Sequence, residues 1–219
     1  MLRPWPPLLL LLACLLSGQA WSLTLEEARA IASGESDARI AALNRAVSTA
    51  DARTVAYLQA LSADAVKLAG ERVLILREDA AFDAVSGAPA PLPDDAQDVI
   101  TNNRMRGEID TALATLQLFS QDAAVRRSAI QALQNAADET RLPLIEKAYA
   151  AEALPALKAR LGLVRAAALL GSSDKARRLE AARLLADSDQ AATKTLLLDH
   201  WQSETDPAVK AALLKACAL

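Results

Sequence analysis

The sequence is poor in the residues that build metal centres, disulfide frameworks and sheet-rich folds. It holds one His and two Cys in 219 residues, only 7 Gly, and 3 Trp, 2 Tyr and 2 Phe as its aromatic residues. Most built-in metal sites and Cys/His catalytic sites need more His and Cys than this. The scarcity of Gly and aromatic residues argues against an all-β sandwich. The net charge of −3 argues against a nucleic-acid binder by bulk electrostatics.

Helix-forming residues are what the chain has in abundance. Ala occupies 50 positions and Leu 38, and these two residues have among the strongest intrinsic helix propensities. The composition therefore predicts a mainly α fold. No G-x-S-x-G motif, Walker loop or G-x-G-x-x-G motif occurs in the sequence. We accordingly expect no enzyme, with no catalytic, cofactor-binding or metal-binding residues and no cofactor.

The first 22 residues have the layout of a secretory signal peptide. Arg3 is the only charged residue before Glu26, and it precedes an apolar run over residues 8–16. After the run, Gly18-Gln19-Ala20 or Ala20-Trp21-Ser22 could serve as the cleavage site. The run is short for a membrane span. We predict a signal peptide over residues 1–22 and an exported mature chain. An uncleaved N-terminal anchor and lipidation at Cys14 are the alternatives.

The segment that follows predicts three helices and then a change of pattern. Thr24 is placed to cap the first helix, a second helix starts at Ser36 and a third near Asp51. Residues 65–68 and 72–76 read as strands, and residues 88–95 are rich in proline. We therefore predict a helical unit over 23–62 and a small β-hairpin with a Pro-rich exit over 63–101.

Residues 102–219 are predicted to be helical repeats. A unit beginning at Asp122 recurs 52 residues later at Asp174 and again at Asp206, and Asp37 marks an earlier copy. Each copy has an acidic residue near a helix start, a basic residue expected to face outward, and an apolar stripe. Spacings of roughly 30–50 residues are typical of HEAT-like α-solenoids. An irregular helical bundle is the alternative.

The few residues whose side chains could act in catalysis are each explained by a structural role. His200, beside Asp199, is expected at the surface or at a cap, and Cys217 on the apolar stripe of the last helix is expected to be a buried thiol. The carboxylate pairs Glu26–Glu27 and Asp94–Asp95 fit a helix start and a solvated loop.

Several basic residues are interspersed with acidic ones in the helical repeats. We interpret them as a solvated outer face, with a partner-binding strip as the alternative. They are Arg126, Arg127, Lys158, Arg160, Arg177, Arg178 and Lys210.

The order of these parts resembles a known family. An export signal, a helical unit, a strand segment, the stretch Asn102-Asn103-Arg104-Met105-Arg106 and degenerate Asp-Pro-Ala-Val-Lys helices follow one another. The chain thus resembles the N-terminal extracytoplasmic region of the urea ABC transporter permease subunit, of the branched-chain amino-acid permease type. Asn102, Asn103, Arg104 and Arg106 form the most specific element of the resemblance, and it assigns them no role.

The resemblance implies an accessory or interaction domain of an ATP-driven importer of urea or a short amide. The implied partners are the permease membrane domain, a periplasmic binding protein and cytoplasmic ATPases. The family's membrane domain follows the helical region, so we expect a chain truncated before it. The chain would then lie at the periplasmic face of the inner membrane and touch the membrane only through the missing part, without binding nucleic acid. A stand-alone periplasmic HEAT-like protein-interaction adaptor is the alternative function.

Overall fold

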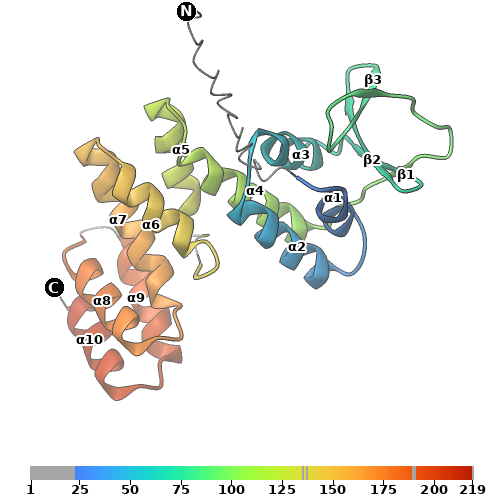
Figure 1. Ribbon diagram of the computed structural model, residues 1–219. Helices are drawn as coiled ribbons and strands as arrows, with labels where there is room; N and C mark the ends of the chain where they lie inside the picture. Colours follow the sequence, from blue (N-terminus) through green and yellow to red (C-terminus); the bar gives the residue numbers. More distant parts are fainter. Residues whose placement is uncertain (1–22, 135, 137, 189–190, 219) are drawn as a thin grey trace, which may run out of the picture.

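The computed structural model describes residues 23–134, 136, 138–188 and 191–218, and the predicted signal peptide lies outside them. The described residues form a mainly helical fold with one small antiparallel sheet (Figure 1). The helices are α1 (Leu25–Ala32), α2 (Ser36–Ser48), α3 (Ala52–Ser62), α4 (Asn103–Gln117), α5 (Ala123–Leu133), α6 (Leu142–Ala151), α7 (Pro155–Leu170), α8 (Lys175–Ala186), α9 (Ala191–Ser203) and α10 (Pro207–Cys217). No helix in these ranges is long and apolar enough to cross a membrane.

The first three helices begin where the sequence predicts. Thr24 caps α1 in a capping box, because its hydroxyl accepts from the Glu27 amide at 3.2 Å and the Glu27 carboxylate accepts from the Thr24 amide at 2.9 Å. Asp51 caps α3 in the same way, accepting from the Thr54 amide at 2.9 Å. The start of α2 at Ser36 is confirmed as well, although Glu35 makes no side-chain cap.

The strand segment forms a larger sheet than the predicted hairpin. The expected pair is present as β1 (Val66–Ala69) and β2 (Arg72–Arg77), joined by a turn in which Gly70 has a φ of +57°. Three further strands, β3 (Ala80–Asp83), β4 (Pro89–Ala90) and β5 (Gln97–Asp98), extend it to the order β4-β3-β2-β1-β5. The prediction of a hairpin alone was wrong: β3 pairs with β2 over four residues, while β4 and β5 pair over only two residues each, too few to leave an alternating pattern.

The described residues contain two hydrophobic cores, and α4 contributes to both. Met105 and Ile109 belong to the core built with α1–α3 and the sheet, whereas Ala114 belongs to the core built with α5–α10. The helix is therefore a shared element between the two halves of the molecule.

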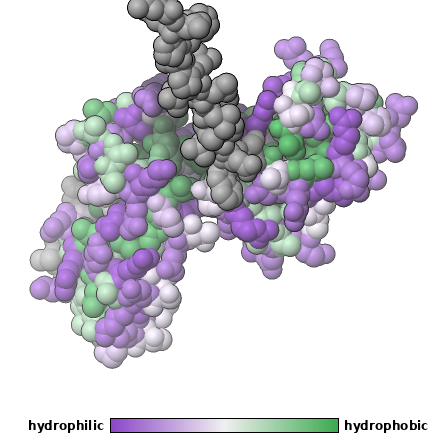
Figure 2. All heavy atoms as spheres, in the orientation of Figure 1, coloured by the Kyte–Doolittle hydropathy of each residue, from purple (hydrophilic) through white to green (hydrophobic). Residues whose placement is uncertain are grey.

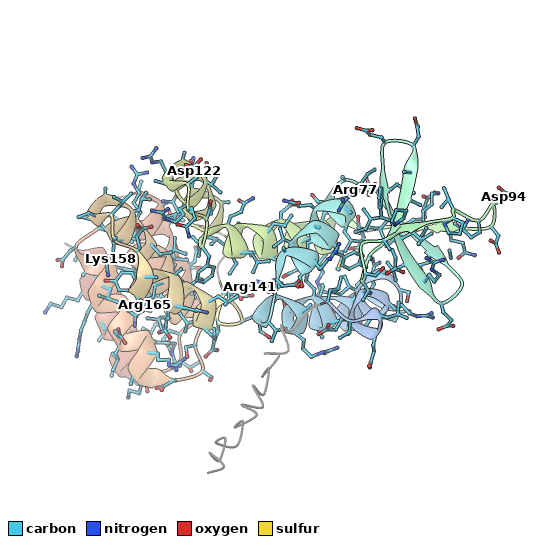
Figure 3. All side chains as sticks on the ribbon, turned by 45° about the horizontal axis from the view of Figure 1, so that its top comes forward. Arg77, Asp94, Asp122, Arg141, Lys158 and Arg165 are labelled. Atoms are coloured by element: carbon cyan, nitrogen blue, oxygen red, sulfur yellow. The ribbon has the colours of Figure 1, made fainter. Side chains whose placement is uncertain are left out.

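A buried arginine reinforces this junction. Arg141, 2% exposed, donates from Nη1 to Oδ1 of Asn44 on α2 at 2.5 Å and from Nη2 to Oε2 of Glu108 on α4 at 3.1 Å. Figure 3 shows Arg141 where the C-terminal helices meet α2.

The C-terminal helices form two layers. In one layer α5 contacts α7, α7 contacts α8, and α8 contacts α10. Helices α6 and α9 pack against α7 and α10, respectively (Figure 1). Each three-helix set, α5–α7 and α8–α10, thus contributes two helices to the first layer and one to the second.

Candidate interaction surface

The residues singled out for catalytic chemistry lie on different elements of the fold. His200 is half-buried on α9, and burial lowers its pKa despite the opposing charges of Asp199 and Glu204. Cys217, predicted to be buried, is only partly so at the edge of the C-terminal core. Glu27 serves as a cap and Asp94 is exposed (Figure 3). Among the described residues, no group of three or more His, Cys, Asp or Glu side chains is placed to hold a metal ion.

The stretch from Asn102 to Arg106 makes intramolecular bonds at the start of α4. Asn102 caps the helix by accepting from the Met105 amide at 2.8 Å, and its Nδ2 donates to the Ser36 hydroxyl at 2.8 Å. Arg104 pairs with Asp37 at 2.5 Å. Asn103, the first residue of the helix, is exposed.

Arg106 anchors the loop that precedes the sheet. Its Nη2 donates to both carboxylate oxygens of Asp64, at 2.6 and 2.8 Å, and Asp64 has a φ of +54°. The stretch from Asn102 to Arg106 therefore ties α4 to the N-terminus of α2 and to the loop between α3 and β1.

A paired arginine and glutamate close the first three-helix unit. Arg126 on α5 donates from Nε to Oε2 of Glu152 at 2.8 Å and from Nη2 to Oε1 at 3.2 Å. Its Nη1 donates to the carbonyls of Ser120 and Gln121 at 2.9 and 3.1 Å. The Glu152 side chain is 3% exposed, and Oε1 also accepts from the Leu154 amide at 2.9 Å. The Arg126 hydrogen bond lowers the pKa of Glu152.

The same arrangement recurs 52 residues later. Arg178 on α8 donates from Nε to Oε2 of Glu204 at 2.8 Å, from Nη2 to Oε1 at 3.4 Å, and from Nη1 to the carbonyls of Ser172 and Ser173. Glu204 also accepts from the Asp206 amide at 2.8 Å. Burial raises the pKa of Glu204, but the Asp206 amide and the Arg178 guanidinium outweigh it, so the net shift is downward.

Two further contacts follow the same spacing. The Lys158 ammonium lies 5.1 Å from the centre of the Tyr149 ring, and Lys210 lies 4.9 Å from the Trp201 ring. The helix caps match too: Asp122 accepts from the Ala124 amide and Asp174 from the Ala176 amide, both at 2.7 Å. Because the helix caps, the Arg–Glu ion pairs and the cation–ring contacts of one set recur at equivalent positions in the other, α5–α7 and α8–α10 are two copies of one structural unit.

The expectation that the basic residue near each helix start faces solvent was wrong for three copies. Arg126 and Arg178 have side chains 17% and 18% exposed, and Arg39 is 8% exposed. In each copy the arginine lies four residues after the N-cap and reaches back to carbonyls before the helix. Sequence reasoning also missed Glu152 and Glu204 as partners. The available signal was the interval of 26 residues between Arg and Glu, which both units share.

The two units also carry equivalent recesses between their first and third helices. The first has a volume of about 280 Å³ and the second about 270 Å³. The first is lined by Arg127, Ile130, Gln131, Gln134 and Arg160, and the second by Ala182, Arg183, Ala186, Ala212, Lys215 and Ala216. Four residues of the second lie 52 positions after four residues of the first.

Each recess holds two exposed cations without a carboxylate. Arg127 and Arg160 in the first, and Arg183 and Lys215 in the second, are exposed and make no ion pair with any described residue. Arg127 and Arg160 thus differ from Arg126 and Arg178, whose guanidinium groups are held by Glu152 and Glu204.

Charge is distributed unevenly between the two halves. Residues 23–118 contain fifteen Asp and Glu against nine Lys and Arg, whereas residues 119–219 contain fourteen Lys and Arg against twelve Asp and Glu. On the face shown in Figure 2, hydrophobic residues of the C-terminal helices show between hydrophilic side chains rather than as one wide patch. The C-terminal half is therefore the more suitable surface for an anionic partner.

No family model, no curated protein and no solved structure matches this chain.

Proposed function

We propose that this chain is an extracytoplasmic interaction domain, and that its C-terminal helices are a HEAT-like α-solenoid. The observation that carries the proposal is the duplicated unit of α5–α7 and α8–α10, with the same Arg–Glu pair and an equivalent recess in each copy. Stacked helical units present repeated side-chain positions along an extended surface, which suits binding another macromolecule. The four cations in the recesses, which make no ion pair with the residues that the structure describes, give that surface a positive charge.

We further propose that the domain serves the permease of an ABC-type importer of urea or a short amide. The support is the resemblance in the order of parts, from the export signal through the stretch at Asn102 to the degenerate helical repeats. In this proposal, residues 1–22 direct export, and the domain lies at the periplasmic face of the inner membrane beside the permease membrane domain. The binding protein and the ATPases are partners in the same assembly.

Affinity capture from a urea-importing bacterium tests the transporter assignment. The chain, tagged at its C-terminus, is expressed in a bacterium that imports urea, and crosslinked partners are solubilised and identified by mass spectrometry. We expect the permease or the binding protein of a urea importer to be enriched over a capture with an unrelated exported helical protein. Enrichment of unrelated periplasmic proteins alone would contradict the transporter role and favour a stand-alone adaptor.

A growth assay tests the same assignment through function. Removing residues 23–219 from the genome is expected to slow growth when urea at low concentration is the nitrogen source, with growth on ammonium unchanged. Equal growth of both strains on urea would contradict a role in urea import.

A further inference from the structure

We propose that the two recesses bind an acidic, extended polypeptide segment of the partner, with one carboxylate cluster in each recess. This inference rests on the proposed role as an interaction domain, and it names the chemistry of the segment that the domain would bind.

The first recess has the side chains that a carboxylate requires. Arg127 and Arg160 approach it from α5 and α7, and neither is neutralised by a described carboxylate. Guanidinium groups form the strongest hydrogen bonds to carboxylates, in a planar paired geometry. Gln131 and Gln134 line the same recess, and their amides can donate to and accept from a peptide backbone.

The second recess differs in a way that favours a carboxylate beside a small apolar group. Arg183 and Lys215 supply the charge, while its other lining residues are alanines. A floor of methyl groups offers no polar partner, so the ligand atoms that contact it should be apolar.

The spacing of the recesses sets the length of the segment. Helices α5, α7, α8 and α10 are successive neighbours in one layer, so equivalent recesses lie two helices apart. Packed helices are separated by roughly 8–10 Å, which gives a distance of about 20 Å between the recesses. An extended chain covers this distance in about six residues. Two acidic clusters about six residues apart can therefore occupy both recesses at once.

An anionic membrane surface fits these recesses less well. Helical surfaces that lie on membranes combine basic residues with large apolar side chains that insert between the lipids. None of the large apolar residues that are exposed, such as Leu154, Leu184 and Leu214, lines either recess. The cations are also set in separate recesses between helices, which matches discrete side chains better than a continuous layer of headgroups.

Fluorescence anisotropy with a defined peptide tests the proposal. The probe is fluorescein-labelled Glu-Glu-Gly-Ser-Gly-Ser-Glu-Glu, added to the full chain. The double variants Arg127→Gln/Arg160→Gln and Arg183→Gln/Lys215→Gln should each weaken binding by about tenfold, as expected for lost charge-assisted hydrogen bonds. The peptide with Gln in place of Glu should not bind measurably. Higher salt should weaken binding, since these contacts are exposed.

The control is Arg177→Gln, which removes an exposed positive charge on α8 outside both recesses. It should leave the affinity within about twofold, in line with a weakly coupled surface charge. Equal weakening by the control, or equal affinity for a peptide with all four Glu adjacent, would overturn the proposal. Binding to phosphatidylglycerol vesicles without binding to the peptide would overturn it too. Circular dichroism melts verify that each variant is folded.

Failure of this inference can be told apart from failure of the proposed function. If the recess variants still crosslink to the transporter subunits, the domain interacts with them through another surface and only the recess assignment is wrong. If the peptide binds as expected but no transporter subunit is captured, the surface binds acidic peptides and only the transporter assignment is wrong.

Discussion

Arginine side chains in this molecule carry out different roles within one or two positions of each other. Arg126 reaches back to two carbonyls before its helix and to a nearly buried carboxylate, while Arg127 lines an open recess and makes no ion pair with a described residue. The first role requires the planar guanidinium fork, because a lysine cannot contact both oxygens of Glu152 and a carbonyl in fixed directions. In the proposed binding role, Arg127 would offer the same planar guanidinium group to a carboxylate of the partner.

The lowered pKa of Glu152 and Glu204 predicts a pH dependence of folding. Both pKa values in the folded chain lie below the value of about 4.3 for an unfolded Glu, so these groups stabilise the fold fully above that value and stop doing so as the pH falls through the folded pKa. We expect Glu152→Gln/Glu204→Gln to unfold at a lower temperature at neutral pH and the difference to shrink below about pH 4. Thermal melts by circular dichroism across this range measure it.

Asp94→Asn/Asp95→Asn provides the charge-matched control, since both residues are exposed on the connection between β4 and β5. This variant should melt like the natural chain across the same range. A melting difference for the glutamate variant that stays constant with pH would show that Arg126 and Arg178 do not depress these pKa values in the folded protein.

At the level of helices and strands, local chemistry was predictable where neighbouring residues determine it. Thr24 and Asp51 predicted the starts of their helices because their side chains are typical caps. The apolar content of residues 66–77 predicted a strand pair. The short strands β4 and β5 were not predictable, because their pairing depends on partners that approach from elsewhere in the chain. The Arg–Glu pairs were missed for the same reason: 26 residues separate their partners.

Substituting two glycines tests whether the turn between β3 and β4 packs against α3, with one glycine as the control for the other. Gly87 has a φ of +70°, and a Cβ there would lie 1.6 Å from the Arg53 guanidinium, whereas a Cβ on Gly107 of α4 would meet nothing within 4 Å. Gly87→Ala should destabilise the fold, because it combines left-handed strain with displacement of Arg53. Gly107→Ala should stabilise it by about 0.5–1 kcal/mol, as in other helix interiors.

Denaturation by guanidinium chloride, followed by circular dichroism, measures both glycine variants. Equal stability changes at the two positions would contradict the placement of the turn at Gly87 against α3.

For the whole molecule, the two halves are coupled through one helix and one buried side chain. Helix α4 shares its residues between two cores, and Arg141 joins α2 and α4 to the start of α6. Its Nε has no hydrogen-bond partner among the described residues, so the junction is satisfied only in part. Neither this junction nor the layering of the C-terminal helices was evident from the sequence, since both depend on residues far apart along the chain.

Replacing Arg141 should weaken the whole fold. Arg141→Met keeps the length of the side chain but leaves Glu108, 31% exposed, without its buried partner. Since the remaining carboxylate is partly solvated, we expect a loss of about 2 kcal/mol, less than for a fully buried pair. Arg45→Met, at an exposed position on α2, is the control and should change stability by less than about 0.5 kcal/mol. Denaturation in guanidinium chloride measures the free energy of unfolding of both variants. An equal loss of stability in the two would argue against a coupling role for Arg141.

Site-specific photo-crosslinking in living cells tests most directly whether the duplicated units form the interaction surface of an importer subunit. A photoreactive phenylalanine analogue replaces Gln131 in the first recess or Ala212 in the second, and Arg177 outside both recesses serves as the control. We predict that the two recess positions crosslink to the same subunit of a urea importer and that position 177 does not. Crosslinks from position 177 alone, or none from either recess, would contradict the account.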